Sequence, residues 1–417
     1  MVLALSLVGV VLAAAVLAGY LWWRLIRDST MPGRTRRWLT VIAIVLTLTP
    51  MAADALNMYL PPAVATPLEW IGYTWLGVLL YLVFAVLALE PIRFILRRRD
   101  LVRAAGPIRP AAVPAEPVAA AIEAGPGDRW VGAVVNSSRR LLLARGLAVA
   151  ALAIAVGAVG TGALSANSAP VVQRVPVTVP GLDPAFDGFR IVTISDVHLS
   201  STYGGAQFRR VIDMVNAEQP DVVAIAGDLV DGDIDELAYD AAMLADLDSK
   251  QGVFFVTGNH EYYVDTQNWM EYLPTLGVRV LRNERVTLRR KTAALDLAGV
   301  DDRTAAASGV PGHGADLPTA LAGRDEINPV VLLAHQPAQV EQAAAAGVDL
   351  QLSGHTHGAQ MWPFEYIIAM DQPLLAGLGQ FGDTQLYVTT GTGYWGPAVR
   401  LGSRPEIPVI ELQSPPA

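Results

Sequence analysis

The sequence predicts an α/β protein in which N-terminal transmembrane helices precede a four-layer α/β/β/α sandwich of two mixed sheets. Two observations carry this prediction. Hydrophobic residues make up 52% of the 417 residues, which is high for a soluble protein, and the excess lies before residue 166. The C-terminal half instead contains short apolar, β-branched runs that alternate with helical segments, as strands and crossover helices do.

Four long apolar segments predict membrane-spanning helices at residues 2–23, 38–60, 68–89 and 141–164. Each has about 20 residues, enough to cross the hydrocarbon core of a bilayer. Arginine is dense after the first and third segments, and the connection between the second and third contains no basic residue. Under the positive-inside rule the arginine-rich stretches are cytoplasmic. We therefore expect the N-terminus and everything after residue 164 to be extracytoplasmic.

These segments divide the chain into four predicted regions. They are a three-span region at 1–90, a cytoplasmic linker rich in Ala, Pro and Arg at 91–140, a fourth transmembrane helix at 141–165 and a catalytic domain at 170–417. Arg139 and Arg140 either anchor the fourth span or form an internal twin-arginine export signal, and the sequence leaves both interpretations open.

Composition excludes several classes of function. The chain has no cysteine, which excludes disulfides, thiolate metal sites and cysteine nucleophiles. Its net charge of -9 gives no electrostatic footprint for a nucleic-acid partner. No glycine-rich phosphate loop with lysine and no Gly-x-Ser-x-Gly turn is present, which argues against a nucleotide-driven motor and a serine hydrolase.

The C-terminal half begins with a β-α-β-α-β series. Its strands are expected at 189–195, 221–226 and 252–257, with helices at about 208–218 and 235–249. Later strands are expected at 278–281, 285–290, 294–300, 329–334, 348–352, 385–390 and 407–412. Right-handed crossovers bring the carboxyl ends of the first three strands to one edge of a sheet. Two mixed sheets packed face to face, with helices outside, accommodate all of these runs.

Clusters of potential metal ligands directly follow several of these strands. They are Asp196 and His198, then Asp228, then Asn259 and His260, then His335, and finally His355 and His357. Imidazole, carboxylate and carboxamide groups together suit Mn²⁺, Fe and Zn²⁺. Two such cations about 3.5–4 Å apart can hold a bridging hydroxide and polarise a phosphoryl group. Asp228 is our candidate for the carboxylate that bridges the two metals.

The clusters resemble those of the calcineurin-like metallophosphoesterases, and most of all their membrane-associated bacterial phosphodiesterase branch. The resemblance covers about residues 177–412 and rests on four motifs: Ser195-Asp196-Val197-His198, Gly258-Asn259-His260-Glu261-Tyr262, His335-Gln336-Pro337 and Gly354-His355-Thr356-His357-Gly358. It implies that Asp196, His198, Asp228 and His357 hold one metal, and that Asp228, Asn259, His335 and His355 hold the other. It also implies that His260 protonates the leaving oxygen or stabilises the transition state.

Departures from the family pattern bear on the substrate. Protein phosphatases of the superfamily have an arginine where this chain has Gly232, so the fork that grips phosphate in those enzymes is missing and a phosphoprotein substrate is disfavoured. We interpret Asp231, Asp233 and Asp235 as a solvated acidic loop. Glu261 replaces an aspartate of those phosphatases, and we expect this change not to touch a ligand.

The resemblance and the membrane segments together predict a multi-pass protein of a bacterial cell membrane. Its expected activity is hydrolysis of an envelope or lipid-linked phosphate ester, a diester in preference to a monoester, through a hydroxide that bridges two divalent metal ions (Mn, Fe or Zn). The lipid bilayer and the phosphate ester are the expected partners. A phosphomonoesterase of the same fold and a non-catalytic metal-binding membrane sensor are the alternatives.

Overall fold

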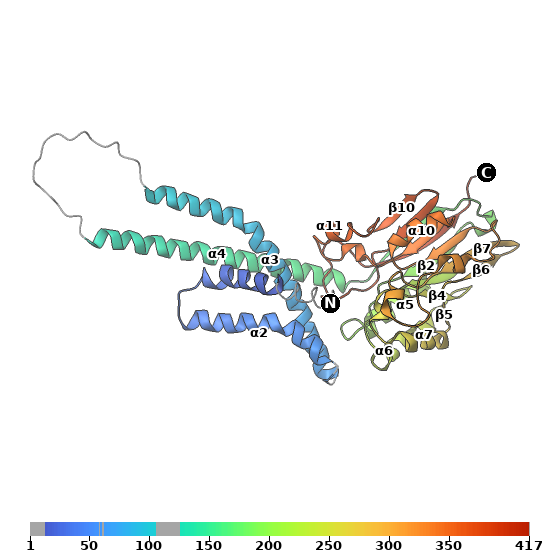
Figure 1. The fold of residues 1–417 in the computed structure, drawn as a ribbon, viewed down its shortest axis with the longest axis horizontal. Coiled ribbons are helices and arrows are strands. Elements are labelled where there is room, and N and C mark those ends of the chain that lie inside the picture. Colours follow the sequence, from blue (N-terminus) through green and yellow to red (C-terminus); the bar gives the residue numbers. More distant parts are fainter. Residues whose placement is uncertain (1–12, 58, 61, 106–125, 417) are drawn as a thin grey trace, which may run out of the picture. The chain divides into compact units, whose positions relative to one another are not determined.

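The structure is a computed structural model that describes residues 13–57, 59–60, 62–105 and 126–416 (Figure 1). The chain forms two compact units. The first contains Met1–Pro61 and Ile71–Val159, and the second contains Pro62–Trp70 and Gly160–Ala417.

The described part of the first unit is mostly helical. Residues 13–21 form a helix that continues into the π-helical turn η1 (Trp22–Arg27), and the long helices are α2 (Arg34–Asn57), α3 (Pro62–Ala105) and α4 (Pro126–Ala166). In the described part of the chain three stretches are long and apolar enough to cross a membrane: Arg34–Ala53, Ala63–Arg99 and Ser138–Ala166. They correspond to the second, third and fourth predicted spans. Half of the first predicted span, residues 2–12 of 2–23, lies outside the described residues.

The predicted linker at 91–140 is wrong at both ends. Residues 91–105 belong to α3 and residues 126–140 belong to α4. The stretch from 92 to 105 contains no Gly or Pro and is rich in Leu, Ala and Arg, which favour helix. Pro126 is the first residue of α4, a position where proline is well tolerated. The rest of the predicted linker, 106–125, lies outside the described residues.

The second unit contains two six-stranded sheets. The first has the order β1-β12-β2-β3-β4-β5, with β1 Val171–Thr178, β12 Glu406–Gln413, β2 Phe189–Ile194, β3 Val222–Ala226, β4 Val253–Val256 and β5 Val278–Val280. The second has the order β10-β11-β9-β8-β7-β6, with β10 Gly377–Phe381, β11 Thr384–Val388, β9 Leu350–Ser353, β8 Val330–Leu333, β7 Ala293–Gly299 and β6 Glu284–Arg290. Strands β2 to β5 are mutually parallel, as are β7, β8, β9 and β11.

Apolar side chains pack in three layers around these sheets. Ile191 and Val222 of the first sheet share one buried cluster with Leu333 and Leu352 of the second, so the two sheets lie face to face. Helices α5 (Gly205–Ala217), α6 (Ile234–Ala241) and α7 (Thr266–Tyr272) share a cluster with the other face of the first sheet. Helices α9 (Leu317–Leu321) and α10 (Val340–Ala345) do so for the second. The predicted four-layer sandwich of two mixed sheets is confirmed.

The sequence reading missed two strands, β1 and β10. Both lie at the end of a sheet, where one row of backbone groups needs no partner and the side chains are mostly uncovered. Pro176 lies within β1, and proline is tolerated there because β1 is an edge strand. This unit also contains the four-residue helices α8 (Ala305–Ser308) and α11 (Glu365–Ile368).

Candidate metal centre

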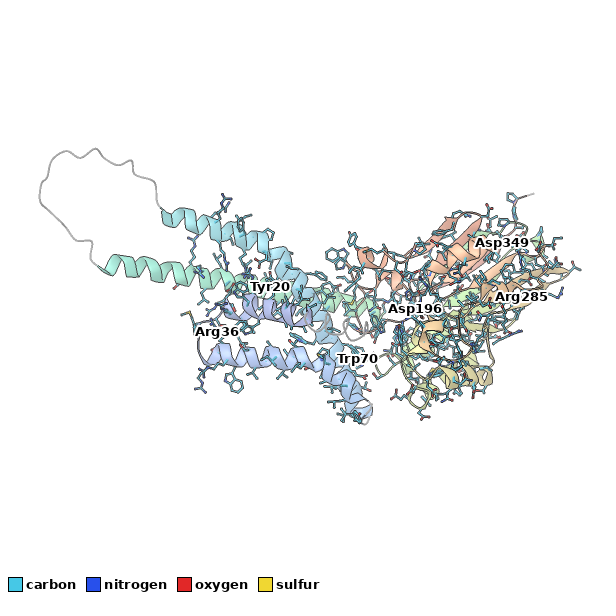
Figure 2. The ribbon with its side chains drawn as sticks, in the orientation of Figure 1. Tyr20, Arg36, Trp70, Asp196, Arg285 and Asp349 are labelled. Atoms are coloured by element: carbon cyan, nitrogen blue, oxygen red, sulfur yellow. The ribbon has the colours of Figure 1, made fainter. Side chains whose placement is uncertain are left out.

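The candidate ligands lie in the turns at the carboxyl ends of parallel strands of both sheets. Asp196 and His198 follow β2, Asp228 follows β3, and His335 and His355 follow β8 and β9. Asn259 and His260 come after β4, and His357 lies two residues beyond His355. The structure brings together Asp196, His198, Asp228, His260, His335, His355 and His357 in overlapping or neighbouring groups, and Asn259 directly precedes His260 in the chain. Figure 2 labels Asp196 within the second unit.

Several of these residues have a left-handed backbone. Positive φ angles of 51° to 72° occur at Asp196, His198, Asp228, His355 and His357. Residues other than glycine adopt this backbone conformation at a cost of about 1–3 kcal/mol, and residues that do so cluster at functional sites. The sharp turns direct consecutive side chains back over the edge of the sheets.

One group of ligands contains Asp196, His198 and His357, all of which are buried. The Nε2 atoms of the two histidines lie 3.0 Å apart, and His357 Nε2 lies 3.3 Å from Asp196 Oδ1. Burial, followed by the charge of His198, lowers the pKa of His357 well below its usual value. A neutral imidazole beside a carboxylate is a ligand arrangement typical of a divalent cation.

A second group contains Asp228, His335 and His355. His335 Nδ1 lies 2.7 Å from the carbonyl oxygen of Ala226. That oxygen can only accept, so Nδ1 carries a proton, and Nε2 lies 3.0 Å from Asp228 Oδ2. Burial, followed by the charge of His335, lowers the pKa of His355 to about 3.

Asn259 Oδ1 is buried and has no hydrogen-bond partner among the described residues. Buried polar atoms are normally satisfied. This atom is a ligand in the predicted second metal site, so the donor set fits a bound cation on an observation independent of the motifs.

Asp228, a member of the second group, also approaches the first group. Its Oδ2 is 3.0 Å from His335 Nε2 and 3.9 Å from His198 Nε2, and its Oδ1 accepts a hydrogen bond of 2.9 Å from the backbone N–H of His260. Burial acts to raise the pKa of Asp228, but the charge and hydrogen bond of His335 outweigh it and hold the pKa well below its usual value. This placement suits a carboxylate shared by two metals.

The solvated position expected for Asp231 is wrong. Its Oδ1 lies 2.8 Å from His198 Nδ1 and 2.7 Å from His260 Nδ1, whereas Asp233 and Asp235 are exposed as expected. A carboxylate bonded to Nδ1 leaves the Nε2 lone pair of His198 for a metal, as carboxylates behind metal-binding histidines do. Burial acts to lower the pKa of His260, but the bond to Asp231 and the charge of Asp228 outweigh it and raise the pKa to about 9.

Glu261 joins the turn after β3 to the turn after β4. Its buried carboxylate accepts hydrogen bonds from the backbone N–H groups of Gly258 at 2.6 Å, Leu229 at 2.7 Å and Asp228 at 3.1 Å. Glu261 is in none of the candidate ligand groups, and it acts on the site by holding the backbone of Asp228. The signal available in the sequence was its place directly after the Asn259-His260 pair.

Arg400 supports the turn that carries His357. The side chain is buried, and it donates to the carbonyl oxygens of Gly393 at 2.6 Å, Thr390 at 2.7 Å and His357 at 3.2 Å. No motif surrounds Arg400, so nothing in the sequence pointed to it. Its donors are directed at backbone carbonyls, and the guanidinium is not available to grip a phosphate.

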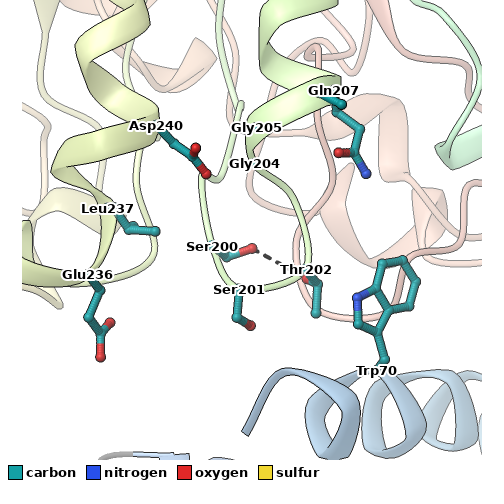
Figure 3. A pocket seen from close by; sticks show the side chains of 11 residues that line it. Trp70, Ser200, Ser201, Thr202, Gly204, Gly205, Gln207, Glu236, Leu237 and Asp240 are labelled. Atoms are coloured by element: carbon teal, nitrogen blue, oxygen red, sulfur yellow. Dashed lines mark hydrogen bonds between the residues drawn. The ribbon is translucent and has the colours of Figure 1, made fainter. Parts of the chain in front are cut away.

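Residues of the second unit also line a separate cavity of about 380 Å³ (Figure 3). The loop after His198 and helix α6 line it with polar groups, among them Ser200, Thr202, Glu236 and Asp240. None of the candidate ligands lines this cavity. It is distinct from the metal centre.

Comparison with known proteins assigns the second unit to a family. Residues 189–359 match the family described as calcineurin-like phosphoesterase. A bovine (Bos taurus) "transmembrane protein with metallophosphoesterase domain" is 40% identical over 298 residues, which cover 69% of this chain and 66% of that protein. An "uncharacterized metallophosphoesterase" from Aquifex aeolicus is 34% identical over 226 residues, which cover 54% of this chain and 85% of that protein.

The first curated relatives are longer than the part they share with this chain, which spans 54% to 66% of their length. Relatives come from animals as well as bacteria, so the resemblance extends beyond the bacterial branch. Among solved structures, the Thermus thermophilus sulfate thiohydrolase SoxB in complex with glycerol matches at a TM-score of 0.35, with 16% identity and 57% of each chain covered. A likeness of that size supports no conclusion about function. The match of residues 189–359 and the identity to the Aquifex aeolicus protein show that this chain belongs to the calcineurin-like metallophosphoesterase family.

Proposed function

We propose that this protein is a membrane-anchored phosphodiesterase with a binuclear metal centre. The observation that carries the proposal is the position of the Asp228 carboxylate, whose Oδ2 lies 3.0 Å from His335 Nε2 of its own ligand group and 3.9 Å from His198 Nε2 of the other. Asp196, His198, Asp228 and His357 would hold one divalent cation, and Asp228, Asn259, His335 and His355 the other. Two such cations would polarise the phosphoryl group of the substrate and activate a water molecule.

His260 suits the role of proton donor to the leaving oxygen. Its bond to Asp231 fixes the ring and, against the effect of burial, raises the pKa of His260 to about 9. Its side chain is 14% exposed, so the ring reaches the surface of an otherwise buried cluster. A protonated imidazole beside the metals can donate as the ester bond breaks.

The charge at the site favours a diester over a monoester. A monoester dianion is commonly gripped by a guanidinium fork. Gly232 stands where the phosphatases carry that arginine, and Arg400 is committed to backbone carbonyls. A diester has one negative charge fewer and needs less compensation.

The membrane anchor favours a lipid-linked substrate. Four residues separate the end of the candidate span Ser138–Ala166 from the start of β1 at Val171. The catalytic unit is therefore tethered close to the bilayer. Tethering raises the effective concentration of a membrane-bound substrate around the enzyme.

The test compares hydrolysis of bis-p-nitrophenyl phosphate and p-nitrophenyl phosphate by the full chain in nanodiscs, purified without chelator and supplied with Mn²⁺, Fe²⁺ or Zn²⁺. We expect metal-dependent cleavage of the diester, lost in Asp228→Ala and retained in Asp383→Ala, whose exposed aspartate lies in a hairpin turn. Preference for the monoester would identify a phosphatase instead. No turnover of either ester, despite bound metals, would favour the sensor.

A further inference from the structure

Five large apolar side chains are exposed in the part of the second unit that follows the ligand turn of β9. Trp362 is 51% exposed, Tyr366 70%, Ile367 62%, Met370 86% and Trp395 58%. We call these five residues the apolar rim. Exposed apolar groups gathered in this way mark interaction surfaces more often than isolated ones do. Helix α11, in the middle of the rim, is labelled in Figure 1.

The rim is fixed to the candidate metal centre. Gln360 Nε2 donates to the carbonyl oxygen of Trp395 at 2.9 Å, and the backbone N–H of Trp395 donates back to Gln360 Oε1 at 3.1 Å. The Thr356 hydroxyl, beside His357, donates to the carbonyl of Leu375 at 2.6 Å. The ring of Trp395 lies 5.7 Å from that of His260, centroid to centroid. Trp395 therefore brings the rim next to His260.

The rim is also connected to the end of a candidate membrane span. The backbone N–H of Arg400 donates to the carbonyl of Gly162 at 2.9 Å, in the last turns of the span that ends at Ala166. The next residue, Leu401, accepts a hydrogen bond of 2.8 Å from the backbone N–H of Trp362. Two consecutive residues thus join the span to the first residue of the rim, and all of them belong to the second unit.

We propose that the apolar rim inserts into the interfacial layer of the bilayer that anchors the chain, and that a lipid phosphate ester reaches the metal centre along it. Tryptophan and tyrosine favour that layer, and isoleucine and methionine can enter the boundary of the acyl chains. Glu365 is the only charged residue from Met361 to Met370, so insertion buries little charge. The route of the substrate rests on the proposed function, whereas the membrane contact does not.

The absence of cysteine allows a direct measurement of depth. Tyr366→Cys and Met370→Cys, each labelled with a nitrobenzoxadiazole fluorophore, would be placed as full chains in nanodiscs whose lipids carry bromine on their acyl chains. Ile327→Cys is the matched control, because Ile327 is 84% exposed and lies just before β8, at the opposite end of that strand from His335.

We expect bromolipid to quench both rim labels at least twofold more than the control label. Quenching at the control level would overturn the proposal. A blue-shifted but unquenched rim label would also overturn it, because protein and not lipid would then cover the rim.

A second variant separates insertion from mere proximity to lipid. In Tyr366→Cys combined with Ile367→Glu and Met370→Glu, the label should be quenched no more than the control, because two charges oppose insertion. Persistent quenching in this triple variant, with thermal unfolding like that of Tyr366→Cys, would refute the role of the apolar side chains. The readout requires neither metal nor turnover, so a failed esterase assay and a failed depth measurement refute different proposals.

Discussion

At the scale of single residues, Asp228 and His260 occupy different surroundings although their atoms are close. The carboxylate of Asp228 contacts histidines of both ligand groups and is almost fully buried. The ring of His260 bonds to Asp231, and the His260 side chain reaches the surface of the protein. The first residue is placed to bind metal, and the second is placed to act on the substrate.

We expect Asp228→Ala to lose both metals and essentially all esterase activity. His260→Ala should retain its metals and lose about 10²–10⁴-fold in kcat, the usual scale for removal of a general acid. Metal content by mass spectrometry and turnover of the diester check both statements, and chelation of the parent protein should reproduce the Asp228→Ala result. Equal metal loss in the two variants would contradict this division of roles.

At the scale of elements, the site depends on how closely the turns after β2 and β9 approach. Gly354 directly follows β9, and a Cβ atom there would collide with Ser195 Oγ and Asp196 Oδ2. The backbone N–H of the next residue, His355, donates to Asp196 at 2.8 Å. Only glycine lets one sheet bring His355 and His357 against the aspartate of the other sheet.

Gly354→Ala should therefore weaken metal binding at least tenfold and lower the free energy of unfolding by about 1–3 kcal/mol, the usual cost of overpacking. Metal titration and thermal unfolding of the full chain measure these effects. Gly160→Ala is the control, since its Cβ would meet nothing within 4 Å. Unchanged metal affinity in Gly354→Ala would show that the two turns can separate without loss of the site.

At the scale of the whole molecule, the arginine-rich ends of several helices of the first unit meet one another. Arg24 contacts Glu90 at 2.9 Å, Asp28 contacts Arg93 at 3.1 Å, and Arg145 donates to the carbonyl of Ser29 at 3.1 Å. The first connection, the end of the third span and the start of the fourth thus share one side. This arrangement supports the proposal that this side is cytoplasmic and that the catalytic unit is extracytoplasmic.

The orientation can be tested with single cysteines in the cysteine-free chain. A membrane-impermeant maleimide should label Ile327→Cys in intact cells and should label Arg98→Cys only after permeabilisation. Ile327 is exposed in the catalytic unit and Arg98 is exposed near the end of α3. The reverse pattern would place the catalytic unit in the cytoplasm.

The sequence by itself determined the parts of the protein that depend on neighbouring residues. Apolar runs long enough to span a bilayer predicted the long helices, and β-branched runs followed by Asp, Asn or His predicted the strands and the ligands at their carboxyl ends. These features are visible because a strand and the turn after it are continuous in the chain. The linker bounds and the edge strands β1 and β10 were missed, because helix propensity extends past an apolar segment and edge strands lack a buried pattern.

Only the tertiary structure decided which other groups support the site. Asp231, Glu261 and Arg400 act on ligands through hydrogen bonds to segments distant in the chain or to backbone atoms, and no spacing rule encodes such contacts. The apolar rim likewise consists of two separate segments that meet beside His260. Their position between the metal centre and the end of a membrane span arises from packing, because hydrogen bonds formed on folding join residues that the sequence keeps far apart.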